Sequence, residues 1–197
     1  MTPTVSIRFV ERFPEPAFAE LQREVFAPLE LSSPEFAAAL RAERSVGSAV
    51  NPELFSPMVR FGAFSDERVV GWSIGWFDRP TSFYMANSGV LPSHRRLGVY
   101  SDLVGAIVGY AQSHGAGTVY SRHSVLNTPI LMATLKLGFI ISGTNLSEHL
   151  GLQVQLVRHA SSARADIFHN RAVPFAAKLA NLRLQPPAAG AMMCRRG

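Results

Sequence analysis

The chain has 197 residues, of which 47% are hydrophobic and 17% charged. This composition excludes an intrinsically disordered chain and a collagen-like repeat, and the length predicts one globular domain able to bury its own core. Cys194 is the only cysteine, so no internal disulfide can form. Because the chain also lacks a basic leader followed by an apolar stretch and any run of 18 apolar residues, we expect a soluble cytoplasmic protein.

The formal net charge of +5 comes from the carboxy-terminal part of the chain. Residues 1–157 hold 12 Arg and Lys against 13 Asp and Glu, whereas residues 158–197 hold seven against one. We therefore expect a nearly neutral body at 1–157 and a basic helical extension at 158–197, its end disordered. Nucleic-acid binding through the extension is an alternative, but the neutral body disfavours it. We expect no membrane partner, and the apolar positions of the extension favour packing on the body or on a second copy.

Hydrophobic periodicity divides the chain into strands and helices. Runs rich in Val, Trp and Phe predict strands, and apolar residues three and four apart, as at Phe18, Leu21 and Val25, predict helices. In chain order we expect a strand at 5–10, helices at 16–26 and 33–44, a loop at 45–57, strands at 58–64, 68–77 and 82–90, a helix at 100–114, a strand at 118–123, a helix at 128–137, strands at 139–144 and 149–157, and two short helices within 164–184. This order predicts a mixed α/β domain with crossover helices.

The most informative segment runs from Val90 to Ser101, where a predicted strand ends and a predicted helix begins. Such a junction exposes backbone N–H groups that lack helical acceptors, and the helix dipole adds partial positive charge there. Gly98 removes side-chain bulk, while Arg95 and Arg96 add formal charge. A pyrophosphate would suit this site. The alternative is that both arginines are solvated residues of an ordinary loop.

The segment resembles the acyl-CoA motif of the GCN5-related N-acetyltransferase family, which is Arg/Gln-x-x-Gly-x-Gly/Ala after a strand ending in Val-x-Pro. Here it reads Val90-x-Pro92, then Arg95-x-x-Gly98-x-Tyr100. A second family element, Asn followed by a helix and Gly-Phe, matches Asn127 through Gly138-Phe139. The resemblance spans about 5–157. It implies a mainly antiparallel central sheet flanked by helices, and acetyl transfer from acetyl-CoA to an amine of a small molecule or protein in a ternary complex.

The resemblance also implies which residues hold acetyl-CoA. The strand from Asn87 to Val90 would pair with pantetheine, and Asn127 would contact the pantetheine arm. The pyrophosphate would lie on the backbone amides that follow Arg95, namely those of Arg96, Leu97, Gly98, Val99, Tyr100 and Ser101. Two positions depart from the family pattern. Tyr100 replaces Gly or Ala, and Thr134 stands where many members place a tyrosine that protonates the departing thiolate.

An alkylamine must lose a proton before it attacks a thioester. His123 is our predicted base because an imidazole titrates near neutral pH, and its alternative interpretation is a strand histidine bonded to backbone. Asn87 is predicted to position a water. Ser124, Tyr100 and Tyr120 are candidate substitutes for the missing proton donor. Thr134 and the lack of a strand carboxylate favour the alternative function, a sensor or interaction module that binds acyl-CoA without turnover.

The acceptor side is less sharply defined. The resemblance implies that residues 26–54 cover the acceptor, with Glu30, Glu35, Glu43 and Glu53 available to a cationic amine or simply solvated. Strand aromatics line an acceptor pocket or belong to the core, namely Trp72, Trp76, Phe77, Phe83 and Tyr84. Gly71 to Gly75 matches the Gly-x-Ser-x-Gly elbow of hydrolases, but its flanks place Ser73 within a strand. The six histidines lack metal-ligand spacing, so no metal is expected.

Overall fold

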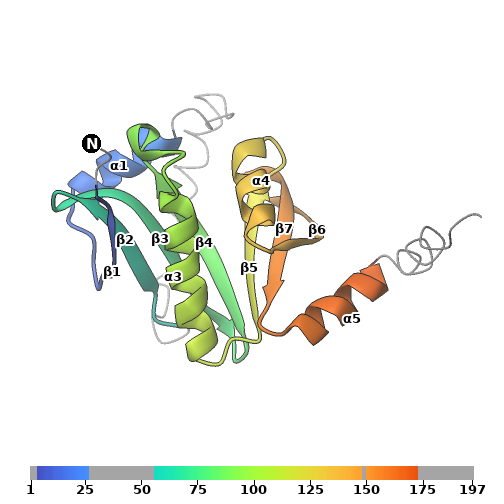
Figure 1. The fold of residues 1–197 in the computed structure, drawn as a ribbon. Helices are drawn as coiled ribbons and strands as arrows, with labels where there is room; N and C mark the ends of the chain where they lie inside the picture. Colours follow the sequence, from blue (N-terminus) through green and yellow to red (C-terminus); the bar gives the residue numbers. More distant parts are fainter. Residues whose placement is uncertain (1–3, 27–55, 148–149, 173–197) are drawn as a thin grey trace, which may run out of the picture. The chain divides into compact units, whose positions relative to one another are not determined.

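The computed structural model describes residues 4–26, 56–147 and 150–172. The chain divides into two compact units, the first ending at Ala160 and the second beginning at Ser161. The described part of the second unit is helix α5 (Ser162–Ala172), whose first turn is held by hydrogen bonds to the hydroxyl and carbonyl of Ser161. The first unit contains the central sheet and helices α1, α3 and α4 (Figure 1).

The elements of the first unit follow the order predicted from the sequence. They are β1 (Ser6–Phe9), α1 (Ala17–Phe26), β2 (Val59–Ser65), β3 (Arg68–Arg79), β4 (Ser82–Val90), the short 3₁₀ helix η3 (Pro92–His94), α3 (Val99–Ser113), β5 (Thr118–Ser124), α4 (Thr128–Lys136), β6 (Ile140–Ser147) and β7 (Gly151–His159). Strand β6 runs past its predicted end because pairing with β7 continues to Ser147 opposite Gly151. The predicted helix at 33–44 and most of the loop at 45–57 lie outside the described residues, as does the second part of 164–184.

The described strands form one seven-stranded sheet in the order β1-β2-β3-β4-β5-β7-β6. Every neighbouring pair is antiparallel except β4 and β5, which are parallel. Parallel neighbours require a crossover, and α3 supplies it. The predicted mixed α/β fold, with a mainly antiparallel sheet flanked by helices, is confirmed.

The parallel pair is short. Only Ser82 to Tyr84 of β4 pair with β5, opposite Thr118 to Tyr120, and no further register pair joins the described residues of these two strands. Ala86 is an extra residue in β4, because Ile74 pairs with Asn87 while the next residue of β3 pairs with Met85. Such a bulge bends a strand and increases its twist. Beyond it β4 and β5 diverge (Figure 1), so polar backbone groups along the facing edges of both strands lack a ladder partner.

Helix α3 covers one face of the sheet and forms the main core there. Its apolar side meets strand residues that alternate onto the same face. The residues of this cluster with essentially no exposure are Phe83, Val104, Ile107, Ala111, Val119 and Leu156. The opposite face carries a smaller cluster under α1. There Trp72 is fully buried, with its ring 5.3 Å from that of Phe18 in an edge-to-face contact.

Gly75 is required by close packing of β3 against β4. A Cβ built at Gly75 would overlap the Tyr84 carbonyl oxygen and the Phe83 ring, and neither a backbone atom nor a core ring can move away cheaply. We predict that Gly75→Ala lowers the free energy of unfolding by about 2 kcal/mol.

The matched control is Gly105→Ala in the interior of α3, where a Cβ meets nothing within 4 Å. Ala is favoured over Gly in a helix, so this variant gains roughly 0.5–1 kcal/mol. Urea denaturation followed by circular dichroism measures both changes. Equal stability of the two variants would contradict the packing account of Gly75.

Candidate functional site

The junction between β4 and α3 presents backbone N–H groups to solvent. Gly98 is the N-cap of α3 at φ +84°, no side chain caps the helix there, and Arg96 also has positive φ, +63°. The first helical hydrogen bond runs from Asp102 N to Gly98 O at 3.1 Å. The backbone N–H groups of the three preceding residues, 99–101, therefore have no acceptor within the helix. Uncapped amides and the helix dipole together favour an anion.

Arg95 anchors this junction. Its Nε donates to the carbonyl of Val90 at 3.0 Å, and one terminal nitrogen donates to the carbonyl of Val25 at 3.5 Å. The guanidinium therefore ties the junction to the end of β4 and to the last turn of α1. Arg96 is exposed, as are Leu97 and Gly98, and a Cβ built at Gly98 meets nothing within 4 Å. Arg95 is exposed as well, but its guanidinium bonds to these two carbonyls, whereas Arg96 has no hydrogen bond or ion pair among the described residues.

The two departures from the family pattern contact each other. The hydroxyls of Tyr100, in the first turn of α3, and Thr134, in α4, lie 3.0 Å apart. Thr134 donates its only proton to the carbonyl of Ile130 at 2.8 Å, so the Tyr100 hydroxyl must be the donor to Thr134. Burial raises the pKa of Tyr100, opposed by this hydrogen bond. A phenol hydroxyl therefore lies beside position 134 although the sequence places its tyrosine on another helix.

Asn127 and Ser124 shape the start of α4. Asn127 is the N-cap of α4, and its side-chain oxygen accepts from Ile130 N at 3.4 Å, which leaves its amide nitrogen available. Ser124 accepts from Leu126 N at 3.3 Å through its hydroxyl oxygen. Both side chains thus take part in the turn that leads from the end of β5 into α4.

His123 has a different environment from that expected. Its Nε2 lies 2.9 Å from the hydroxyl of fully buried Ser121, and burial lowers the pKa of His123 to about 4. The imidazole is therefore neutral at pH 7, with a lower affinity for protons than the ordinary value near 6.5 assumed from the sequence.

The sheet separates the three predicted catalytic side chains. Val119, Ser121 and His123 are two residues apart along β5, so all three point to the face that α3 covers. Asn87 lies on the other face, where its side-chain oxygen accepts from Trp72 Nε1 at 2.7 Å. Ser124 follows His123 and therefore also lies on the α1 face. The structure brings Asn87 and Ser124 to one face and leaves His123 on the opposite one.

The aromatic residues considered for the acceptor side divide between two environments. Phe77 and Phe83 pack edge to face at 5.2 Å in the α3 core, and Trp72 lies under α1. Trp76 and Tyr84 are half-buried on the α1 face, where Trp76 packs edge to face on Tyr84 at 5.2 Å.

Strand β5 extends this second group. Tyr120 stacks on Tyr84 at 4.8 Å, and the Arg122 guanidinium lies 5.7 and 5.6 Å from the centres of the two rings. We call Trp76, Tyr84, Tyr120 and Arg122 the tyrosine platform. Arg122 is not among the site residues predicted from the sequence, although alternation along β5 places it on the same face as Tyr120.

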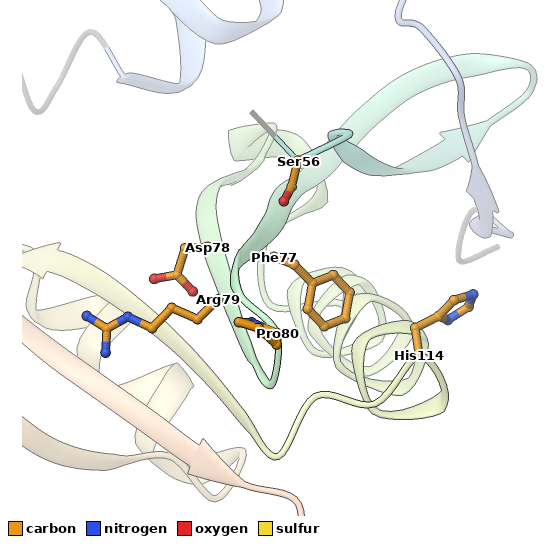
Figure 2. Close-up of a pocket in the computed structure, with 6 residues that line it drawn as sticks. All are labelled: Ser56, Phe77, Asp78, Arg79, Pro80 and His114. Carbon is orange, nitrogen blue, oxygen red and sulfur yellow. The ribbon is translucent and has the colours of Figure 1, made fainter. Parts of the chain in front are cut away.

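Two other features are a buried serine and an open pocket, and Asp78 of the pocket accepts a hydrogen bond from Tyr120 of the tyrosine platform. Ser73 is fully buried within β3 and hydrogen-bonded to the Ser88 hydroxyl at 2.8 Å, which confirms its placement in a strand and excludes a hydrolase elbow. An open pocket of about 410 Å³ surrounds the β3–β4 turn and is lined by Ser56, Phe77, Asp78, Arg79, Pro80 and His114 (Figure 2). His114 is the C-cap of α3, so this pocket lies at the opposite end of the helix from Gly98.

Two further features are absent from the described residues. In that part of the chain no helix is long and apolar enough to cross a membrane. The same residues contain no cluster of three His, Cys, Asp or Glu side chains with the geometry of a metal site.

A diverging parallel strand pair beside an uncapped helix N-terminus defines an α/β protein with free backbone N–H groups where the two strands part. Residues 16–139 match the model of the acetyltransferase (GNAT) family, and the chain belongs to that family. This confirms the resemblance seen in the sequence, and acetyl transfer is the general activity of the family. No protein of curated function matches the chain.

Solved structures show the same fold. The ribosomal-protein-S18-alanine N-acetyltransferase of Escherichia coli is 13% identical, with a TM-score of 0.59 over 80% of this chain and 95% of that one. Ard1 of Thermoplasma volcanium is 19% identical, with a TM-score of 0.57 over 80% and 99%. A Bacillus subtilis acetyltransferase in complex with CoA is 17% identical, with a TM-score of 0.55 over 80% and 100%.

The pKa of His123 predicts a pH dependence of stability. The unfolded chain binds a proton at this imidazole near pH 6.5, but the folded chain does so only near pH 4. Lowering the pH through this window therefore favours the unfolded state, by up to about 3 kcal/mol. We predict that His123→Gln loses less stability than the parent chain between pH 7 and pH 4.5. Urea titrations at several pH values measure the free energy of unfolding of both proteins. If it depends on pH in the same way in both, burial does not lower the pKa of the His123 imidazole.

Proposed function

We propose that this protein is an N-acetyltransferase that transfers the acetyl group of acetyl-CoA directly to an amine in a ternary complex. The observation that carries the proposal is the parting of β4 and β5 next to the uncapped N-terminus of α3. The backbone amides of residues 96–101 would bind the pyrophosphate, with Arg96 adding charge. The structure of the B. subtilis acetyltransferase with CoA supports this choice of co-substrate.

In this proposal the rest of acetyl-CoA lies where β4 and β5 part. Pantetheine is an extended chain with amide groups, and β4 from Asn87 to Val90 has no ladder partner on its β5 side. This edge offers backbone hydrogen bonds, although the Val90 carbonyl already accepts from Arg95. The side-chain nitrogen of Asn127, at the start of α4, would contact the same arm. Arg95 acts indirectly in this proposal, because its contacts with Val90 and Val25 hold the anion-binding backbone in place.

The reaction needs two proton transfers. The amine nitrogen attacks the thioester carbon, the N–C bond forms, the C–S bond breaks, and the amine loses a proton while the thiolate gains one. His123 remains our proposed base, and its pKa of about 4 places the acidic limb of the rate profile near pH 4 instead of pH 6.5. Asn87 and Ser124 would position water on the other face.

We assign the proton donor for the thiolate to Tyr100. Its hydroxyl lies beside position 134, where many family members carry a tyrosine, and its raised pKa keeps it protonated at neutral pH. Thr134 would hold the phenol in place. A family protein that binds acyl-CoA without turnover is the alternative, and release of CoA thiol with a panel of amines distinguishes the two.

The placement of the pyrophosphate predicts the effect of Gly98→Val. The side chain would strain a residue at φ +84° and reshape the anion-binding backbone, so the Kd for acetyl-CoA should rise about tenfold or more. Gly115→Val is the matched control, because Gly115 also has positive φ, +92°, and open space around it but follows the far end of α3. Calorimetric titration measures both. An equal rise in Kd for the two variants would refute the placement, and no binding by the parent chain at millimolar acetyl-CoA would refute the proposed function.

The role of Tyr100 predicts different effects for two variants that break the same hydrogen bond. Tyr100→Phe removes the proton donor, so kcat should fall about 10- to 100-fold with little change in the Kd for acetyl-CoA. Thr134→Val keeps the phenol and the side-chain shape, so kcat should fall much less. Steady-state rates of thiol release test this pair. Equal losses in both variants would indicate that the hydrogen bond matters only for packing.

A further inference from the structure

Arg122 is held in a fixed orientation on the tyrosine platform. Its Nε donates to the side-chain oxygen of Gln155 at 3.0 Å, and the Gln155 side-chain nitrogen donates in turn to the Ser142 hydroxyl at 3.2 Å. The guanidinium also lies over the rings of Tyr84 and Tyr120. An arginine held by a hydrogen bond and two aromatic contacts has lost most of its rotamer freedom before any ligand arrives.

The platform beneath Arg122 is equally well defined. The Tyr120 hydroxyl donates to the Asp78 carboxylate at 2.7 Å. Burial and this carboxylate raise the pKa of Tyr120 to about 12, so the phenol stays neutral. Tyr84 is fixed between the stacked ring of Tyr120 and the edge of Trp76. The surface that faces a ligand is therefore aromatic and held in place by these contacts, and its charged groups are the Arg122 guanidinium and, at its border, the Asp78 carboxylate.

The charge of Arg122 has no partner in the part of the chain that the structure describes. There the one ion pair joins Arg8 to Glu67, at the other side of the sheet, and the hydrogen bond from Arg122 uses Nε alone. The two terminal nitrogens keep four N–H donors in a planar fork, which matches the two oxygens of a carboxylate. A half-buried cation with this edge free is suited to bind an anion.

The position of Arg122 relates this anion site to the opening in the sheet. Arg122 lies two residues beyond Tyr120, the last residue of β5 that pairs with β4. Arg122 projects onto the α1 face of the sheet. Helix α3, whose N-terminus is the proposed pyrophosphate site, covers the opposite face. A ligand bound by Arg122 therefore lies beside the opening without competing for the amides of residues 96–101.

We propose that Arg122 and the tyrosine platform select the acceptor, and that the acceptor is an amine that also carries a carboxylate. The inference rests on the proposed acetyl transfer. The carboxylate binds the two terminal nitrogens of Arg122, the carbon chain lies against Tyr84 and Tyr120, and the amine reaches the thioester between β4 and β5.

Matched pairs of amines test the inference. Each pair is an amino acid and its carboxamide, from glycine through the straight-chain ω-amino acids, assayed by release of CoA thiol. The parent protein should show a kcat/KM about tenfold or more higher for the best carboxylate than for its amide. Arg122→Met should abolish this preference by lowering kcat/KM for the carboxylates far more than for the amides, and Arg122→Lys should retain part of it because the charge remains without the fork.

Arg8→Met is the matched control, because Arg8 also lies over an aromatic ring, that of Phe64 at 4.1 Å, but at the opposite side of the sheet. It should keep the full preference. Calorimetric titration of the same amines into the protein with CoA provides a readout that does not need turnover. Equal affinity and rate for carboxylates and amides, or a preference that survives in Arg122→Met, would overturn the inference. Failure of the proposed function is seen separately, in titrations of acetyl-CoA without an amine.

Discussion

The described fold depends on an interruption in backbone pairing. Strands β4 and β5 pair through three residues and then part, after the bulge at Ala86 has bent β4. Parallel neighbours need a crossover, so the chain that leaves the open end of β4 must enter α3 before it returns as β5. The topology that opens the strands therefore also places the N-terminus of α3 beside the opening. Backbone groups of β4 and β5 that would pair in a continuous sheet therefore lack a strand partner. They lie beside the N–H groups of the first turn of α3, which lack a partner within the helix.

The sequence predicts much of this arrangement because its signals are local. Alternation and spacing place the strands and helices, and the junction that contains Gly98 can be recognised from a strand end, two arginines and a glycine. The partners of those residues cannot be predicted in this way. The second acceptor for Arg95 is Val25, 70 residues away, and Tyr100 finds Thr134 across 34 residues. Both contacts arise only when separate elements pack together.

The chemistry of single side chains was harder to predict than the fold. The sequence assigns His123 an ordinary pKa, but burial lowers that pKa to about 4, and burial is set by residues packed from other elements. The aromatic residues show the same limit. Composition groups Trp76 and Tyr84 with Phe77 and Phe83, whereas alternation sends the first two to the α1 face and the last two into the α3 core. Only the observed register makes that division clear.

The face of the sheet on which each residue lies connects the proposed acetyl transfer with the proposed acceptor site. His123 and Arg122 are neighbours in β5 but lie on opposite faces of the sheet, just beyond the last residue of β5 that pairs with β4. In the proposed complex, acetyl-CoA enters from the N-terminus of α3 and occupies the free edge of β4. The acceptor must then approach from the α1 face, where a fixed guanidinium lies beside two stacked rings. An anionic group on the acceptor would be held at Arg122 away from the negative pyrophosphate, which avoids repulsion between the two substrates.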